Sequence, residues 1–401
     1  MKDAYIIDGI RTPIGKFTGT LSPIRTDDLA AHVIKALVDR NAQIPLDAYD
    51  DVIMGCANQA GEDNRNVARM ALLLAGLPHT VPGETVNRLC SSGLSAIIHA
   101  TRAIRAGDGD LFISGGVEHM TRGPFVMSKV SKAFGRDAQL FDSSFGWRFV
   151  NDKLDKAYGT DGMGITAENL QEMYDISRED QDKFAAWSQQ KAAAAQSSGR
   201  LAKEIVSVSI PRRKQDDLVF DNDEFIRAGT TAEILAKLRP AFKKNGTVTA
   251  GNASGLNDGS VATLIASSAA VEQYALKPMA RIVSSAVVGV EPRIMGIGPV
   301  QASNKALQKA GITMDQVDVI ELNEAFAAQA LACTREWGLA DDDPRINPNG
   351  GAIAIGHPLG ATGARLALSA AIELKERKAK YALVTMCVGV GQGYAAVLQN
   401  V

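Results

Sequence analysis

The 401-residue sequence has little of three things that would each indicate a class of protein. It contains four cysteines, Cys56, Cys90, Cys333 and Cys387, which are too few for the disulfide framework of a secreted protein and lack the spacing of a metal site. Its formal net charge is only -2, so we expect no binding surface for nucleic acid or for an anionic membrane. No apolar run is long enough to cross a bilayer. These absences favour a cytoplasmic protein with free thiols, no metal, and small molecules as partners.

The order of features along the chain predicts an α/β protein that contains a duplication. Short β-branched runs, such as 51–54 and 110–114, alternate with longer stretches of helical period. The pattern at 51–55 recurs at 318–322, and the glycine-ended apolar run at 110–116 recurs at 381–389. We therefore predict two copies of one α/β unit packed face to face around a shared cleft.

A stretch of different composition separates the two copies. It holds most of the tryptophans and many charges, and it ends near turn-forming residues. We predict an N-terminal half from 1–120 and 248–270, an inserted lobe at 121–247, and a C-terminal half at 271–401.

Cys90 is the first candidate nucleophile. It precedes Ser91, Ser92 and Gly93 and a run of helical period that Gly107 is expected to end. A thiol at a helix N-terminus meets the positive end of the helix dipole, so we expect its thiolate to be favoured. The alternative is that Cys90 is a small buried apolar residue.

His357 lies among glycines, from Gly350 to Gly360, and Pro358 follows it directly. Glycines permit positive φ and close backbone contact, so we expect His357 at a tight strand-to-helix turn. A hydrogen-bonded structural imidazole is the alternative.

Two further motifs follow strands. Cys387 ends an apolar run and opens the glycines of 389–393, where backbone amides can face a reacting oxygen. The G-x-G-x-G spacing is not the dinucleotide fingerprint, so we exclude a nicotinamide site there. Asn323 follows the apolar run 317–320 and could hold a water molecule or polarise a carbonyl. It could equally be a helix N-cap.

Together these four motifs resemble the signatures of the thiolase family, in the same order and across nearly the whole chain. They are Cys90 in its setting, 323–326, 356–358 and 387–391. The resemblance implies a thiolase fold, with a duplicated five-layered αβαβα core and an inserted loop domain. It also implies a homotetramer that acts on acyl-CoA substrates, uses coenzyme A or acetyl-CoA, and holds no permanent cofactor.

The same resemblance implies a mechanism for the candidate residues. Cys90 would attack the keto carbon of a 3-oxoacyl-CoA while His357 takes its proton, and Cys387 would act as acid and base. One oxyanion pocket would be formed by His357 with a water held by Asn323, and the other by the backbone amides of Cys90 and Gly389.

The resemblance also suggests residues for coenzyme A. Arg227 would lie near the nucleotide, and Ser254 would bond the pantetheine. The charge run 212–214 could reach a phosphate, although a solvated face is the other interpretation.

Within the family, three segments are similar to 3-oxoadipyl-CoA thiolases of aromatic degradation: 55–70, 146–149 and 347–351. Acetoacetyl-CoA thiolases usually carry His-Met-Gly where this chain reads 161–164 as Asp-Gly-Met-Gly. The substrate implied is 3-oxoadipyl-CoA, cleaved to succinyl-CoA and acetyl-CoA. A terminal carboxylate needs a cationic partner, and the candidates are Arg65, Arg69 and Arg148.

Several other functions compete with this one. An acetoacetyl-CoA thiolase and a broad 3-ketoacyl-CoA thiolase of fatty acid β-oxidation would use the same site. A decarboxylating ketosynthase uses one cysteine with two histidines and would need a histidine where this chain has Cys387. A non-catalytic acyl-CoA-binding protein would need no intact triad, and a cysteine hydrolase would not need Cys387.

Overall fold

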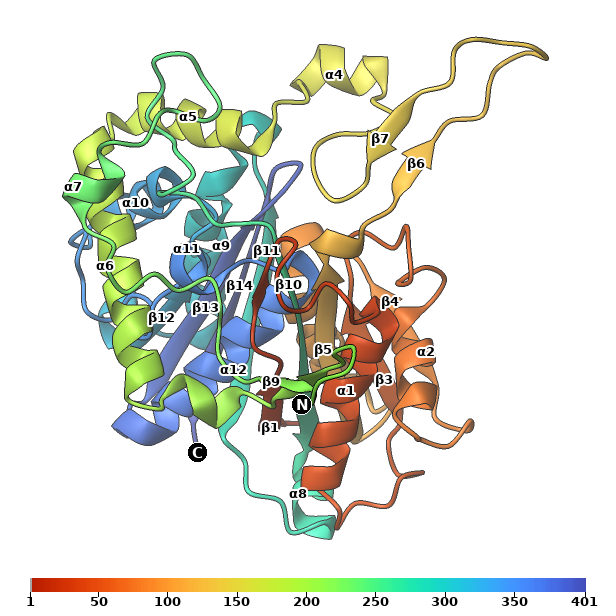
Figure 1. The fold of residues 1–401 in the computed structure, drawn as a ribbon. Coiled ribbons are helices and arrows are strands. Elements are labelled where there is room, and N and C mark those ends of the chain that lie inside the picture. The colour runs from red at the N-terminus through yellow and green to blue at the C-terminus, as the bar shows by residue number, and fades with distance from the viewer. Residues whose placement is uncertain (1) are drawn as a thin grey trace.

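The structure is a computed structural model that describes residues 2–401, and a ten-stranded mixed β-sheet forms its centre (Figure 1). The strands of this sheet are β1 (Ala4–Arg11), β2 (Gly15–Lys16), β3 (Asp51–Gly55), β4 (Gly83–Val86), β5 (Leu111–His119), β10 (Asn257–Ser267), β11 (Ala280–Gly289), β12 (Val319–Leu322), β13 (Tyr381–Val388) and β14 (Gln392–Asn400). The main path runs β12-β13-β14-β11-β1-β10-β5-β3-β4, and β2 pairs with β10 beside it.

One pairing pattern occurs twice in this sheet. In the first half β1 is antiparallel to β10, β10 is antiparallel to β5, and β3 is parallel to both β5 and β4. In the second half β11 is antiparallel to β14, β14 is antiparallel to β13, and β13 is parallel to β12, beyond which Ile320 makes an isolated parallel bridge to Ile346. Within the sheet, the halves are joined where Tyr5 and Ile6 of β1 pair with Arg281 and Ala280 of β11. The predicted duplication is confirmed.

Helices cover both faces of each half and produce five layers. They are α1 (Thr26–Arg40), α2 (Val67–Leu74), α3 (Ser92–Ala106), α8 (Ser268–Gln273), α9 (Gly298–Ala310), α10 (Ala327–Glu336), α11 (Ala352–Ile355) and α12 (Leu359–Arg377). Helices α1 and α2 share an apolar core with β3, β5 and β10, and α9 and α10 share another with β11 to β14. Between the halves, α3 and α12 pack on each other and on strands of both. The five-layered α/β fold is therefore as predicted.

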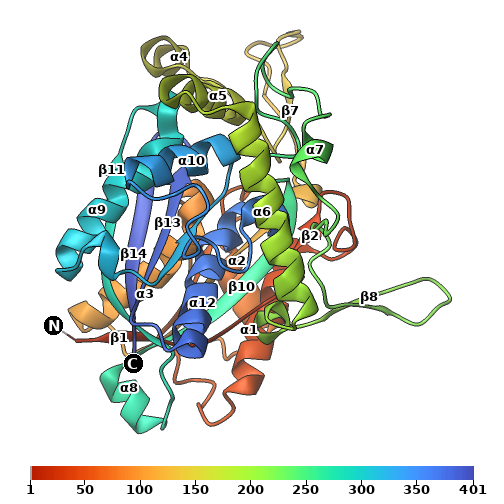
Figure 2. The ribbon, with the colours of Figure 1, turned by 90° about the vertical axis from the view of Figure 1, so that its left-hand side faces the viewer.

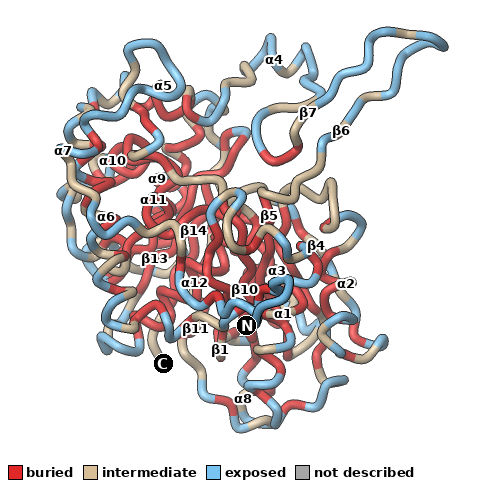
Figure 3. Tube along the Cα trace, in the orientation of Figure 1, coloured by how far each residue is buried: buried red, intermediate tan, exposed pale blue. Residues whose placement is uncertain are grey.

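The position of each strand between the layers determines how far its residues are buried. Every residue of β5 and β10 is buried, because helices lie on both faces of these strands. Burial instead alternates along most of β11. Figure 3 shows the buried chain concentrated in the sheet and in the helices between its halves.

A long insertion separates β5 from β10, at the place where the second half has only the short turn 389–391 between β13 and β14. The insertion contains β6 (Phe125–Met127), β7 (Leu140–Asp142), α4 (Asp152–Tyr158), α5 (Met163–Tyr174), α6 (Arg178–Ser197), β8 (Val208–Ile210), β9 (Leu218–Phe220) and α7 (Ala232–Leu235). Helices α5 and α6 contact α10, and α6 also contacts α11, so this part of the insertion rests on the C-terminal half. That 121–247 forms a separate lobe stays a prediction.

Two hairpins of the insertion extend from the body of the protein. The β6–β7 hairpin projects at the top of Figure 1, and the β8–β9 hairpin projects at the right of Figure 2. Among residues 2–401, no helix combines the length and the apolar character that crossing a bilayer requires.

Candidate active site

Cys90 lies where the chain enters α3, in the 3-10 turn Leu89–Ser91. Asn87 Oδ1 accepts a hydrogen bond from the Leu89 N–H at 2.8 Å, and Leu89 itself has a left-handed φ of 45°. Such backbone strain in a non-glycine residue is held in place by its surroundings and is common at functional sites. Gly107 ends α3 with φ 91°, as predicted. Of the four free cysteines, only Cys90 is not fully buried, so it is the thiol that a substrate can reach.

The charge state of Cys90 differs from the sequence-based expectation. Burial raises the pKa of the Cys90 thiol to about 11, and hydrogen bonds from the backbone N–H groups of Gly389 and of Cys90 itself lower it only in part. The expected thiolate is therefore wrong for the free protein, because desolvation outweighs the amides at the helix N-terminus. Cys90 is a thiol at neutral pH and needs a base.

His357 lies between two helices, since 352–355 form the short helix α11 and α12 begins at Leu359. The predicted strand-to-helix turn is therefore wrong, although the tight turn exists. Gly356 has φ 115°, and a Cβ there would come within 2.6 Å of the Asn257 side chain. That closeness lets Asn257 Oδ1 accept a hydrogen bond from the His357 N–H at 2.9 Å, which fixes the backbone of His357.

The hydrogen bonds of the imidazole ring determine its tautomer. The Thr362 hydroxyl donates to the Pro358 carbonyl at 2.8 Å, so it must accept from His357 Nδ1, which is 2.8 Å away. Nε2 is then the unprotonated nitrogen. Burial and the charge of Arg365 lower the pKa of His357 to about 3, so the ring is neutral at neutral pH and can accept a proton at Nε2.

Asn323 faces the imidazole. Its Nδ2 lies 3.4 Å from His357 Nε2, and its Oδ1 is buried without a hydrogen-bond partner among the described residues. The N-cap of α10 is Phe326, so the alternative that Asn323 caps this helix is wrong. The side-chain amide of Asn323 and Nε2 of His357 thus lie next to each other.

Cys387 lies in β13, one residue before the strand ends, and its side chain is fully buried. Burial, and then a charge on Cys90, raise the pKa of Cys387 well above its usual value. The hydrogen bond from Gly389 to the Cys90 sulfur brings the turn after β13 to the same place. The structure therefore brings the two thiols, which lie at opposite ends of the sequence, together.

Close packing of small residues brings the imidazole to the thiols. A Cβ on Gly93, in α3, would lie 2.7 Å from the Gly360 carbonyl oxygen, and a Cβ on Gly363, in α12, would lie 2.5 Å from the Leu94 nitrogen. The backbones of the two helices therefore touch within their first turns. Because Cys90 and His357 lie just before these turns, both lie near the contact between the two helices.

Two buried carboxylates support these segments. Glu324 accepts hydrogen bonds from Ser188, Asn347 and the Ile353 N–H, and so holds the chain that leads to His357. Glu118 accepts from the N–H groups of residues 57, 58 and 360, which ties the start of α12 to the loop after β3. The roles of Thr362, Asn257 and Glu118 were not predictable from the sequence, because only the contacts in the folded chain give these residues a role.

The candidates for coenzyme A lie on two different segments. The Ser254 N–H donates to the Ala325 carbonyl at 3.0 Å, two residues from Asn323, so Ser254 lies on the strand-like segment beside the site. Arg227 is exposed, its N–H donates to Gln189 Oε1 at 2.7 Å, and its guanidinium lies over Phe225. The charge run 212–214 follows β8 and is solvent-exposed.

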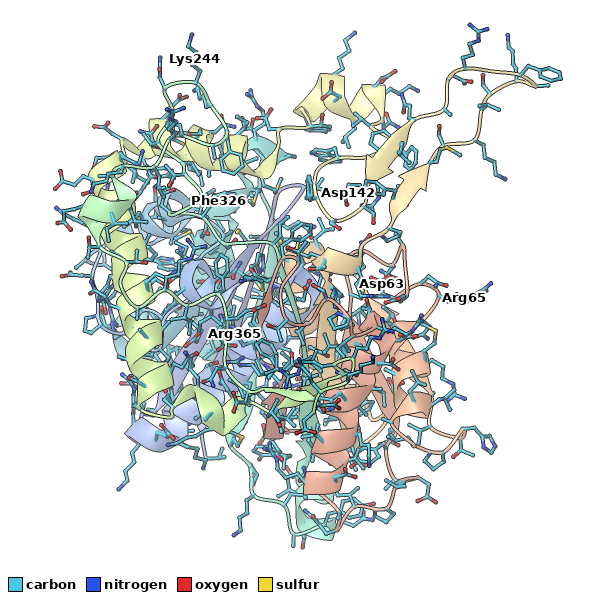
Figure 4. All side chains as sticks on the ribbon, in the orientation of Figure 1. Asp63, Arg65, Asp142, Lys244, Phe326 and Arg365 are labelled. Carbon is cyan, nitrogen blue, oxygen red and sulfur yellow. The ribbon has the colours of Figure 1, made fainter. Side chains whose placement is uncertain are left out.

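The three arginines proposed for a substrate carboxylate are not brought together. Arg65 is exposed, and Figure 4 shows it at the edge of the molecule, far from Phe326 and Arg365. Arg69 donates to the carbonyls of residues 79 and 81. Arg148 donates to the Ser143 carbonyl at 2.9 Å and to Asn58 Oδ1 at 3.3 Å, next to the loop that Glu118 holds.

Comparison with known proteins matches the whole chain to one family. The family described as "Thiolase, N-terminal domain" matches residues 4–269, and "Thiolase, C-terminal domain" matches residues 276–400. A protein of Acinetobacter baylyi named "Beta-ketoadipyl-CoA thiolase" is 60% identical over 401 residues, with 100% of both chains covered. An Escherichia coli protein named "3-oxoadipyl-CoA/3-oxo-5,6-dehydrosuberyl-CoA thiolase" is 58% identical, also with 100% of both covered.

A solved structure shares the fold. The crystal structure of the Bacillus anthracis acetyl-CoA acetyltransferase superposes with a TM-score of 0.92 at 40% identity, covering 100% of this chain and 99% of that one.

Proposed function

The chain belongs to the thiolase family, and we propose from this premise that it cleaves 3-oxoadipyl-CoA with coenzyme A to give succinyl-CoA and acetyl-CoA in the catabolism of aromatic compounds. The observation that carries the proposal is the full-length identity of 58–60% to proteins named for this substrate. The site described above supplies the groups that the reaction needs.

In the first half-reaction the Cys90 sulfur attacks the keto carbon, and its proton passes to His357 Nε2. A thiol with a pKa of about 11 and an imidazole with a pKa of about 3 do not exchange a proton before the attack, so the transfer accompanies formation of the C–S bond. The bond between C2 and C3 then breaks, and the acetyl-CoA enolate takes a proton from Cys387. A succinyl thioester remains on Cys90.

In the second half-reaction the thiol of coenzyme A gives its proton to the Cys387 thiolate and attacks the thioester carbonyl. The tetrahedral adduct expels the Cys90 sulfur, which recovers its proton from His357. Both cysteines and the imidazole return to their starting states, and ping-pong kinetics are expected.

Each half-reaction places negative charge on an oxygen. The N–H groups of Cys90 and Gly389 form the first oxyanion pocket, since both already donate to the Cys90 sulfur. His357, with a water held by Asn323 Oδ1, forms the second. Ser254 holds the pantetheine and Arg227 lies near the nucleotide.

The protein acts in the cytoplasm as a homotetramer. Support for assembly comes from the β6–β7 hairpin, which exposes large apolar side chains on an arm that projects from the body. A projecting apolar arm of this kind is typical of a protein contact surface.

Steady-state thiolysis tests the substrate. We expect kcat/KM for 3-oxoadipyl-CoA to exceed that for acetoacetyl-CoA and for long-chain 3-oxoacyl-CoA by at least about 10-fold, because only the first offers a terminal carboxylate. A preference for acetoacetyl-CoA would identify an acetyl-CoA C-acetyltransferase. A preference that grows with chain length would identify a β-oxidation thiolase.

A further inference from the structure

A small recess lies beside the catalytic turn and has no assigned role. Its lining is shared by the insertion, the segment before α9 and the turn after β13, and consists of Trp147, Gly159, Asp161, Met163, Pro292, Arg293 and Val390. Val390 directly follows Gly389, whose N–H reaches the Cys90 sulfur. The recess is therefore bounded by the residue that follows the one whose N–H reaches the Cys90 sulfur.

The 3-10 segment Pro292–Ile297 brings a cation to this recess. Met295 of this segment packs in one apolar cluster with Cys387, and Pro292 lies against the turn residue Gly391. Arg293 is on the same short segment and lines the recess. Arg293 is therefore an arginine of the recess that is two residues from a side chain packed with Cys387.

Arg293 is held on one side only. Its Nε donates to Asp161 Oδ2 at 3.0 Å, and Asn169 Nδ2 donates to the same carboxylate oxygen at 3.0 Å and to the Arg293 carbonyl at 2.9 Å. Within residues 2–401 its two terminal amino groups have no hydrogen-bond partner, and its side chain is 54% exposed. A guanidinium can bind carboxylates on two edges, so the free edge remains available for a second one.

The other candidate arginines are less suited to an anionic substrate. Arg69 already donates to two backbone carbonyls, and Arg65 lies at the far edge of the molecule. Arg148 donates to Ser143 and Asn58.

The insertion also leaves space next to Arg293. Gly162 lies between Asp161 and Met163, which both line the recess, and a Cβ added to Gly162 would meet nothing within 4 Å. A longer side chain here would occupy space that an acyl group can use.

We propose that Arg293, oriented by Asp161, binds the terminal carboxylate of the dicarboxylic acyl group while its keto carbon is at Cys90. This assignment rests on the proposed function and names the residue that makes the site select a dicarboxylate. The carboxylate lies three carbon–carbon bonds from the keto carbon, so its receptor must lie close to the Cys90 sulfur. The recess is a candidate because Val390, which lines it, follows Gly389, whose N–H reaches that sulfur.

The test compares 3-oxoadipyl-CoA with 3-oxohexanoyl-CoA, which has a methyl group in place of the carboxylate. In the full-length protein, we expect Arg293→Gln to lower kcat/KM for 3-oxoadipyl-CoA by about 30-fold or more, mainly through KM, because the substrate charge loses its partner. Thiolysis of 3-oxohexanoyl-CoA should change by less than about 3-fold. Arg293→Lys keeps the positive charge but loses the planar guanidinium with its paired N–H donors. Its kcat/KM for 3-oxoadipyl-CoA should lie between those of Arg293→Gln and the wild type.

Arg102→Gln is the matched control, because it removes the same charge from an exposed side chain near the C-terminal end of α3, and it should leave both substrates unchanged. An equal loss on both substrates in Arg293→Gln would show a structural role, and an unchanged preference for 3-oxoadipyl-CoA would assign the carboxylate to another residue. Either result overturns the proposal. If the wild-type protein itself does not prefer 3-oxoadipyl-CoA, the proposed function fails instead, so the two failures are distinguishable.

Discussion

At the scale of single residues, the site depends on which nitrogen of His357 carries the proton. Thr362 accepts from Nδ1 because its own proton is donated to Pro358, and this keeps Nε2 free to act as a base. Thr362→Val removes the hydroxyl that accepts from Nδ1, so the tautomer that carries its proton on Nε2 becomes accessible. We expect kcat to fall by about 10–100-fold, as it does when partners of catalytic imidazoles are removed, with little change in KM.

Thr362→Ser is the matched control for this prediction, since it keeps the hydroxyl, and it should retain most of the wild-type kcat. Full activity in Thr362→Val would show that the imidazole holds its tautomer by other means.

The charge on Cys90 gives a pH-dependent prediction. Because burial raises the thiol pKa to about 11, its thiolate fraction is small at neutral pH and grows as the pH rises towards that value. The ultraviolet absorbance of thiolate, measured as the difference between wild type and Cys90→Ala, should be absent at neutral pH and appear only in alkali. A thiolate signal that is already present in weak acid would instead indicate an ion pair with His357.

The sequence predicted the identities of Cys90, His357 and Cys387 as candidates, because glycines and helix starts mark positions where the chain turns tightly and leaves backbone N–H groups free. It did not predict that Cys90 is a neutral thiol, because desolvation depends on how completely the folded chain covers the sulfur. It also gave no indication of Thr362, since a threonine at helical spacing from a proline is common in any helix.

At the scale of elements, the contact between α3 and α12 sets the distance between thiol and base. Replacing Gly363 by alanine would gain about 1 kcal/mol of helix propensity, but the new Cβ would lie 2.5 Å from the Leu94 backbone nitrogen. Backbone cannot yield as a side chain does, so overpacking of about 1–3 kcal/mol should outweigh the gain. We expect a lower unfolding temperature and a lower kcat in Gly363→Ala.

Gly229→Ala is the control, because a Cβ there meets nothing within 4 Å. It should leave both the unfolding temperature and kcat near the wild-type values. An unchanged kcat in a destabilised Gly363→Ala would mean that the helix contact supports the fold without setting the catalytic geometry.

Most elements near the site were predictable from the hydrophobic periodicity of the sequence and from residues that end helices. Helix α3, which ends at Gly107, is an example. The turn at His357 was not predictable. Residues 352–355 form a short apolar segment, and its sequence is equally consistent with the end of a strand. Its contact with α6 of the insertion, far away in the sequence, makes it a helical turn.

At the scale of the whole molecule, the exposed β6–β7 hairpin provides a test of the proposed homotetramer. Met127 and Phe134 are 69% and 103% exposed on this arm. Replacing both by glutamate should weaken the contact between subunits and lower the mass measured by analytical ultracentrifugation, because charge would have to be buried in the interface. Val219→Glu, on the β8–β9 hairpin, is the control and should keep the wild-type mass. Identical masses for all three proteins would remove the hairpin from the interface.

The duplication could be predicted because both copies keep the same order of strands and glycines. The contact between the copies could not, because it depends on the small residues that line one face each of α3 and α12, and the sequence alone does not tell which helices will meet.

The doubled architecture has a consequence for how this enzyme can be dismantled. Cys90 and His357 occupy matching positions, one before the central helix of each repeat, so the proposed nucleophile belongs to one repeat and its proposed proton acceptor to the other. Neither repeat alone contains both groups. A fragment that carries one repeat would therefore hold only one of the two groups that the proposed reaction needs.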